Sequence, residues 1–510
     1  MQDSQQNNKQ IAKNTLLLYF RMLFMMAVSL YTSRVVLATL GVEDFGIYNV
    51  VGGIVTMFSF INSAMSSSTQ RYLTFELGRG DFSQLQRVFS TSIIIHALIS
   101  VIIIILAETI GLWFLYYKMN IPAIRMPAAS IVYQMSILSM VVMVMSVPYN
   151  SAIIAHEKIS AFAYISILEA ILKLSIVFVL MFSGFDKLVL YAILMFAVQF
   201  IIRIVYGWYC KKRFNECKII LAKDWKLFKE MLAFASWSLW DYISYIAYTE
   251  GLSILLNIFF NPVINAARGL AGQVSDAVGR FYTNFQTAIN PQITKSYAVG
   301  DFEYLHSLVY RSCRISFILL LMVSLPVILE TEKILSIWLT TVPDYTASFV
   351  RLTFVSSFIG TLANPLGISV LATGKVKRYQ TCVGITLLAI LPISYIVLKL
   401  GGDPNSVYIA TILINAIALY LRLAIVCPLI RLSKIKYLSN VIIRCSILGV
   451  AASIVPALLK FSLKDDFVSF FTVIAISILS VLLFSYFIGL TPNEQIAVRN
   501  KVSQKIKNIK

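Results

Sequence analysis

Three arginines interrupt long apolar segments of this chain, and they are the residues whose placement demands the most specific chemistry. Arg21, Arg268 and Arg280 each lie within a run that is otherwise rich in apolar side chains. An arginine at the centre of a membrane-spanning helix costs about 2.5 to 3.5 kcal/mol on insertion scales, so it should face protein or water rather than lipid. These three positions therefore predict a wet or protein-lined interior within a membrane.

Polar residues accompany these arginines at helical spacing, in steps of three or four residues that put them on one side of a helix. In segment 262–288 the stripe consists of Asn265, Arg268, Gly272, Asp276, Arg280 and Asn284. In segment 44–66 it consists of Asn49, Gly52, Thr56, Ser59, Ser63 and Ser66. Two such stripes that face each other would line a central cavity. The alternative is that Asp276 merely pairs with Arg280 and that the small polar residues hold helices together.

Two acidic residues lie in segment 231–256, beside the stripe of segment 262–288. Asp241 and Glu250 could couple transport to an ion or a proton, or they could balance the charge of the arginines. The three histidines are scattered without ligand spacing, so no metal is expected, and no phosphate-binding loop or catalytic group is apparent. We therefore expect a protein that is not an enzyme and needs no cofactor.

The elements that position these residues are membrane-spanning helices. The chain is 58% apolar and 13% charged, with mean hydropathy +0.80, which excludes a soluble protein. Continuous apolar windows, long enough to cross a bilayer as helices, exclude an alternating β-barrel pattern. We expect spans at 14–37, 44–66, 89–114, 129–153, 160–183, 188–210, 231–256, 262–288, 312–329, 347–371, 379–399, 406–428, 441–459 and 467–490.

The first twelve of these spans form two copies of a six-helix unit. Gly80-Asp81-Phe82 recurs as Gly300-Asp301-Phe302, and the order of markers that follows Pro148 recurs after Pro365. Internal repeats in a membrane protein are typical of a transporter with its substrate site where the halves meet. The predicted organisation is a first six-helix lobe, a basic interlobe linker, a second six-helix lobe, and two added helices with a basic tail, at residues 1–210, 211–230, 231–428 and 429–510.

Positive charge is concentrated in alternate connections between the spans. These connections include the linker 211–230 and both ends of the chain, so both termini are expected on the cytoplasmic side. The net charge of +19 then reflects topology and attraction to anionic membrane lipids rather than binding of nucleic acid. The expected fold is an all-α polytopic membrane protein with fourteen transmembrane helices.

Several segments resemble a known family. The run 33–48, with Ser33-Arg34-Val35 and Leu40-Gly41-Val42-Glu43-Asp44-Phe45-Gly46, is similar to the opening signature of bacterial polysaccharide flippases. These flippases belong to the multidrug/oligosaccharidyl-lipid/polysaccharide exporter (MOP) superfamily. Segments 70–81, 154–158 and 265–270 resemble later parts of the same pattern, and the likeness covers nearly the whole chain, including the two added helices.

This resemblance implies a specific activity in the bacterial inner membrane. It implies that undecaprenyl-diphosphate-linked oligosaccharide repeat units, destined for O-antigen, capsule or related polymers, move from the cytoplasmic to the periplasmic leaflet by alternating access. The cavity arginines would be Arg21, Arg34, Arg268 and Arg280, whose guanidinium groups match phosphate oxygens and stay charged when partly dehydrated. Polysaccharide polymerase and chain-length machinery would be the protein partners.

Two other functions remain open at this point. A cation-coupled multidrug antiporter of the same fold would have an acid-lined cavity, and such antiporters often carry an acid in the first helix. Residues 14–37 contain no acidic residue, which favours an anionic cargo. A scaffold of the envelope machinery that transports nothing would leave the two polar stripes unexplained.

Overall fold

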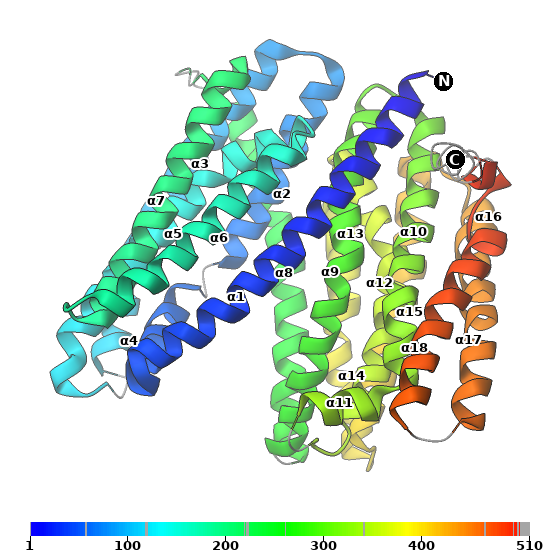
Figure 1. Cartoon of the computed structure of the whole chain (residues 1–510). Coiled ribbons are helices and arrows are strands. Elements are labelled where there is room, and N and C mark those ends of the chain that lie inside the picture. The colour runs from blue at the N-terminus through cyan, green and yellow to red at the C-terminus, as the bar shows by residue number, and fades with distance from the viewer. Residues whose placement is uncertain are drawn as a thin grey trace, which may run out of the picture. The chain divides into compact units, whose positions relative to one another are not determined.

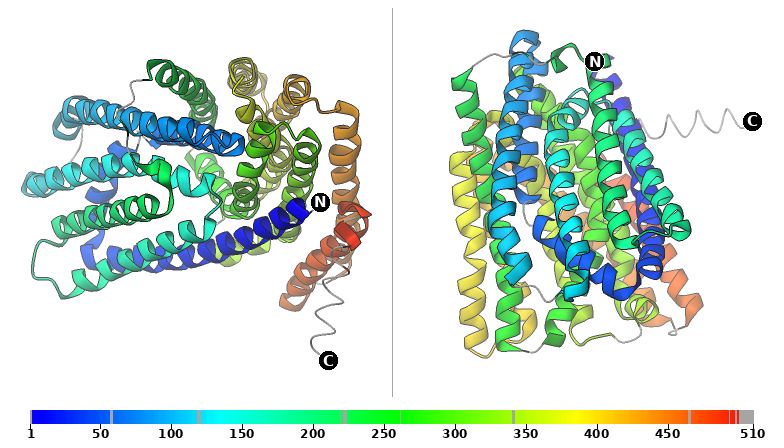
Figure 2. Two further views of the ribbon diagram at one scale, coloured as in Figure 1. Left: turned by 90° about the horizontal axis from the view of Figure 1, so that it is seen from above. Right: turned by 90° about the vertical axis from the view of Figure 1, so that its left-hand side faces the viewer.

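The computed structural model describes residues 2–56, 59–117, 121–218, 220, 224–260, 262–339, 342–463, 466–492, 494–496 and 499. Within these ranges the chain is almost entirely helical and contains no strand. Figures 1 and 2 show the helices as coiled ribbons from three directions. The expectation of an all-α polytopic membrane protein is confirmed.

The long helices follow the apolar runs of the sequence, and short 3₁₀ or π turns lie at several of their ends. The elements are α1 (Gln2–Thr56), α2 (Ser59–Arg79), α3 (Phe82–Leu106), η1 (Ala107–Gly111), α4 (Leu112–Tyr117), η2 (Ala123–Arg125), α5 (Met126–Ala155), α6 (Ile159–Phe182), α7 (Lys187–Arg213), η3 (Asn215–Cys217), α8 (Trp225–Phe259), α9 (Pro262–Ala298), α10 (Phe302–Leu329), α11 (Thr331–Trp338), α12 (Thr346–Thr373), α13 (Lys377–Leu388), α14 (Ile390–Lys399), α15 (Pro404–Leu429), α16 (Lys434–Tyr437), η4 (Leu438–Ile443), α17 (Arg444–Ser462), α18 (Phe467–Phe484) and η5 (Ser485–Gly489).

Ten segments among the described residues are long and apolar enough to cross a membrane. They correspond to ten of the fourteen expected spans. The other four expected spans, 14–37, 44–66, 231–256 and 262–288, are also helical, in α1, α2, α8 and α9. Two of these four carry the polar stripes, and polar side chains lower the hydropathy of a helix that borders protein or water instead of lipid. The count of fourteen and the cytoplasmic termini stay predictions.

The repeated glycine–aspartate turns have the same local conformation in both copies. Gly80 and Gly300 adopt left-handed backbone angles, with φ of 74° and 77°. The following aspartates cap the next helix, because Asp81 Oδ1 accepts the N–H of Gln84 at 2.9 Å and Asp301 Oδ1 accepts that of Tyr304 at 3.0 Å. Glycine tolerates a positive φ without steric cost, and an aspartate satisfies a free N–H at a helix start. The sequence repeat is thus also a repeat of local structure.

The chain divides into two compact units, each with its own contacts. The first comprises Met1–Tyr242 and Thr294–Val299, and the second comprises Ile243–Ile293 and Gly300–Lys510. In the first unit α5 packs against α7 and α2, and α1 packs against α6. Figure 1 shows α1 in blue as a long helix with a bend. The helical geometry breaks at Gly41 (φ 79°, ψ 168°), between the first two expected spans.

Charged residues join three separate segments of the first unit. Arg125 in η2 binds Asp44 through Nε at 2.8 Å and through a second guanidinium nitrogen. Its Nη1 also lies 2.7 Å from Asp186 Oδ2 at the start of α7. This cluster connects the region after the α1 bend with the starts of α5 and α7.

In the second unit α10, α12 and α15 pack together, and the added helices α17 and α18 pack on each other and on α10. The fully buried Tyr437 donates its hydroxyl to the carbonyl of Leu362 at 2.5 Å. Near the end of the described chain, Arg314 Nη2 donates to both carboxylate oxygens of Glu494, each at 3.1 Å. Arg444 donates to the carbonyls of Ile488 and Leu490 and so caps the last helical turn.

Candidate functional site

Arg21 lies half-buried on α1, against an aromatic ring of α6. Its guanidinium carbon is 4.4 Å from the centre of the Phe162 ring, a cation–π arrangement. The Nε atom is buried and has no hydrogen-bond partner among the described residues. Part of this guanidinium is therefore shielded from water by carbon while its charge is retained.

Acidic and polar groups surround Arg21 in the first unit. Glu169 and Tyr206 interact electrostatically with its guanidinium. Glu169 itself accepts hydrogen bonds from Lys173 at 2.6 Å and from Gln199 at 3.2 Å. Glu169 therefore neutralises Lys173, one turn away on the same helix, rather than forming a direct salt bridge with Arg21. The sequence signal for this pair was its spacing of four residues, which places both side chains on one face.

Arg268 on α9 is held by neutral oxygen atoms of the second unit. Its Nε donates to Ser253 Oγ at 3.0 Å and its Nη2 donates to the carbonyl of Thr249 at 2.7 Å, both on α8. Tyr408, on α15, interacts electrostatically with this side chain. No acidic side chain of the described residues forms a salt bridge with Arg268, so its positive charge is oriented but not neutralised.

The remaining stripe residues of α9 differ in exposure along the helix. Asp276 and Arg280 are exposed and form no salt bridge with each other, so the simple pairing that their spacing allows does not occur in the part of the chain that the structure describes. Asn265 is half-buried, and its side-chain oxygen has no hydrogen-bond partner among the described residues. The α9 stripe thus contains one anchored arginine, one exposed arginine and one exposed acid.

Several predicted site residues lie outside the described side chains. These are Arg34, Asn49, Thr56, Ser63 and Asp241. Glu250 is described; it is exposed on α8 and forms no ion pair with a described residue. Within the described residues no group of His, Cys, Asp and Glu has an arrangement that could hold a metal ion.

One polar group of the first unit escaped the sequence analysis. Glu108 lies in the π turn η1, where it accepts a hydrogen bond from Gln134 at 3.3 Å. In the same turn the carbonyl of Ala107 accepts the hydroxyl of the buried Tyr133 at 2.7 Å. Single π turns within helices often occur at functional sites, but no sequence pattern distinguishes them from a regular turn.

Comparisons with known proteins give a family match over part of the chain and a fold match over most of it. The family model MatE matches residues 18–179. No curated protein sequence matches the chain.

Three solved structures illustrate the fold match. An outward-facing multidrug resistance MATE family transporter of the MOP superfamily has a TM-score of 0.72 and 14% identity, over 83% of this chain and 96% of that one. The MATE transporter ClbM in complex with Rb+ has a TM-score of 0.66 and 16% identity, over 84% of this chain and 97% of that one.

The third is a MOP superfamily transporter from Pyrococcus furiosus, described as having a binding pocket of reversed polarity. Its TM-score is 0.68 and its identity 14%, over 82% of this chain and 96% of that one. At these identities the match concerns the fold. The chain is a multi-pass membrane protein with the helical fold of the MATE transporters.

Proposed function

We propose that the protein is a flippase for undecaprenyl-diphosphate-linked oligosaccharide repeat units. It would move them from the cytoplasmic to the periplasmic leaflet of the bacterial inner membrane, by alternating access through a cationic central cavity. The main support is Arg268, whose guanidinium is held by two α8 oxygens and forms no salt bridge with an acidic residue that the structure describes. A charge that is oriented by neutral groups stays available to a diphosphate, which binds guanidinium through charge-assisted hydrogen bonds.

Two further arginines support an anionic cargo. Arg280 is exposed on the same helix and is not paired with Asp276. Arg21 presents a partly dehydrated guanidinium against Phe162, and electrostatic attraction is stronger where water is excluded. In this proposal the headgroup crosses through the wet interior while the polyprenyl tail stays in the bilayer. Membrane lipids and, in the cell, polysaccharide polymerase and chain-length machinery would be the partners.

The second candidate function is a cation-coupled multidrug antiporter. It is supported by the fold match to a transporter described as a multidrug resistance protein and to one in complex with Rb+. Exposed Glu250 on α8 would supply an acid for coupling. Against it stands the lack of any acid in residues 14–37. The reported reversal of pocket polarity in another MOP superfamily transporter supports the idea that cargo charge can differ within one fold.

An export assay separates the two functions. In a strain that lacks this protein, we expect the wild type to restore surface polysaccharide, and Arg268→Ala and Arg280→Ala to lower export by roughly tenfold or more, since a charge-assisted hydrogen bond contributes about 1.5 to 3 kcal/mol. Arg351→Ala is the matched control, because Arg351 pairs with Glu332 at 2.7 Å on an exposed surface.

The assay also has outcomes that contradict the proposal. Normal export by both stripe variants, at membrane levels equal to the wild type, would remove the basis for phosphate binding. Unchanged polymer with increased sensitivity to cationic drugs in the deletion strain would favour the antiporter instead.

A further inference from the structure

The turn between α12 and α13 is a short basic connection at one face of the membrane. α12 ends at Thr373 and α13 begins at Lys377, and both helices belong to candidate spans. Gly374 closes α12 in a left-handed conformation (φ 75°), and its N–H donates to the carbonyl of Leu371 at 3.1 Å. A three-residue connection between two spanning helices lies at the depth of the lipid headgroups. The alternation of positive charge along the sequence assigns this face to the cytoplasm.

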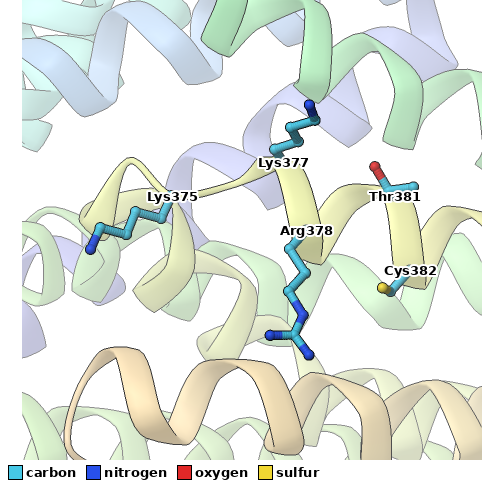
Figure 3. A pocket seen from close by; sticks show the side chains of 5 residues that line it. All are labelled: Lys375, Lys377, Arg378, Thr381 and Cys382. Carbon is cyan, nitrogen blue, oxygen red and sulfur yellow. The ribbon is translucent and has the colours of Figure 1, made fainter.

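A hollow of about 580 Å³ opens beside this turn. Figure 3 shows its lining residues as sticks, with three long cationic side chains that extend from the turn and the start of α13. The three cationic side chains are exposed, and the other two are half-buried. The lining consists of Lys375, Lys377, Arg378, Thr381 and Cys382. The surface of the hollow is mostly carbon, and the three cationic side chains point in different directions from it (Figure 3).

The helices that carry this basic hollow contain no acidic residue. No Asp or Glu occurs in the sequence between Asp344 and Asp403, so α12, α13 and α14 carry none. Lys375 and Arg378 form no salt bridge with any residue that the structure describes. Lys375 and Arg378 therefore keep a positive charge that attracts an anionic ligand.

The equivalent turn of the first repeat shows that the turn itself does not require these cations. The repeat offset of 217 residues aligns Gly374 with Glu157, which has the same left-handed conformation, with φ 57°. Ser160 and Ala161 stand where the second repeat has its second and third cations. The backbone conformation is therefore kept with one basic residue, so the extra charge in the second repeat calls for an explanation other than folding.

We propose that this basic hollow binds the phosphate group of an anionic phospholipid in the cytoplasmic leaflet. The site lies at headgroup depth, three cations contribute to its lining, and most of its surface is carbon, which suits a phosphate attached to glycerol and acyl chains better than a free ion in water. Each Lys or Arg near an anionic membrane surface contributes about 1 kcal/mol of attraction. The inference does not depend on the proposed cargo, because these residues lie outside the polar stripes.

The chain contains a natural reporter for this site. Cys382 lines the hollow and is half-buried, whereas the other five cysteines are buried. Full-length protein would be placed in nanodiscs of phosphatidylcholine alone or with added phosphatidylglycerol, and the rate of Cys382 modification by an uncharged maleimide measured in each. We expect phosphatidylglycerol to slow the reaction by roughly threefold or more. The variant Cys382→Ala gives the background from the buried thiols.

Two charge variants decide whether the site is specific. In the triple variant Lys375→Gln/Lys377→Gln/Arg378→Gln, the rate of Cys382 modification should be the same in both lipids, so that the ratio of the two rates falls to one. The matched control Arg431→Gln/Lys434→Gln/Lys436→Gln removes the same charge from another expected cytoplasmic turn and should keep the wild-type ratio. Comparing ratios within each variant cancels any direct effect of charge on thiol reactivity.

Other outcomes would overturn the proposal. Equal rates of Cys382 modification in both lipids for the wild type would show that there is no site. An equal loss of protection in both charge variants would show that only the general surface potential acts. Protection by inorganic phosphate in pure phosphatidylcholine nanodiscs would show a site for soluble anions. If the triple variant does not fold, Lys375→Gln alone is tested by native mass spectrometry, where it should retain less phosphatidylglycerol than the wild type.

Discussion

Lys295, near the end of α9, lies against Glu157 in the turn after α5, with Nζ 2.5 Å from Oε1. Glu157 combines a left-handed backbone (φ 57°) with a buried position. A residue with a Cβ in this conformation costs about 1 to 2 kcal/mol, so neighbouring contacts must hold it. The carbonyl of Glu157 also accepts a hydrogen bond from Asn14 at 3.4 Å. The ion pair thus joins the end of α9 to a strained turn of the first unit.

Removal of the lysine should destabilise the protein. Lys295→Ala removes the lysine ammonium group from the Glu157 carboxylate, whose side chain is only 10% exposed. The pair is intermediate between surface and fully buried ion pairs, so we expect a loss of about 1 to 3 kcal/mol, measured as a lower melting temperature in detergent. In the Lys295→Ala background, Glu157→Gly should restore part of the loss, because glycine removes both the strain and the buried carboxylate. Additive effects in this double-mutant cycle would contradict the interpretation.

Gly78 on α2 should tolerate no larger side chain. A Cβ built at this position would lie 2.9 Å from Ala298 Cβ and 3.1 Å from the backbone of Lys295. We expect Gly78→Ala to lower the free energy of unfolding by about 1 to 3 kcal/mol through overpacking. Gly52→Ala is the control, because its Cβ would meet nothing within 4 Å. Equal melting temperatures for the two variants would show that α9 does not pack closely on α2 here.

The Asp186 carboxylate should make stability depend on acid pH. Burial alone would raise the pKa of Asp186, but hydrogen bonds from Arg125 and from the N–H groups of Val189 and Leu188 outweigh it and lower the pKa. Because the folded pKa lies below the unfolded one, the carboxylate stabilises the protein above about pH 4 and loses this effect as the pH falls through the folded pKa.

Asp186→Asn should therefore melt below the wild type near neutral pH and approach it in acid. The measurement is the melting temperature of both proteins over a pH series of about 7 to 3. A constant difference over the series would mean that the carboxylate does not act through its charge.

Arg268→Lys should separate charge from geometry. Lysine keeps the positive charge but lacks the planar fork that contacts two α8 oxygens. Under the proposed function we expect Arg268→Lys to export polysaccharide at a level between the wild type and Arg268→Ala, reduced by roughly threefold to tenfold relative to the wild type. Full export by the lysine variant would show that charge alone suffices.

The helices and the repeat could be predicted because both depend on local sequence. Apolar runs, the glycine turns and the aspartate caps each act within a few residues, as Asp81 and Asp301 do. The break at Gly41 also falls between two expected spans. All fourteen spans were expected from apolar runs, and the spacing of polar residues added a prediction of which face of segments 44–66 and 262–288 avoids lipid.

Contacts between distant segments could not be predicted. Arg125 meets Asp44 and Asp186 only because three separate helix ends come together, and nothing in the local sequence of any one of them indicates the other two. Likewise the α9 spacing placed Arg268 on a polar face, but its contacts with Ser253 and Thr249 depend on how α8 packs. Sequence periodicity identifies the face of a helix, whereas packing decides what that face contacts.

The arginine contacts near the end of the described chain bear on where this protein can be shortened. A chain trimmed at Leu490, the last residue of the final apolar run, would lose Glu494 and leave the half-buried Arg311 and the buried Arg314 without their shared carboxylate. A shortened chain should therefore keep the residues through Gln495, and a C-terminal tag should be attached after that residue. The side chain of Gln495 also donates a hydrogen bond to the carbonyl of Tyr486 at 2.7 Å.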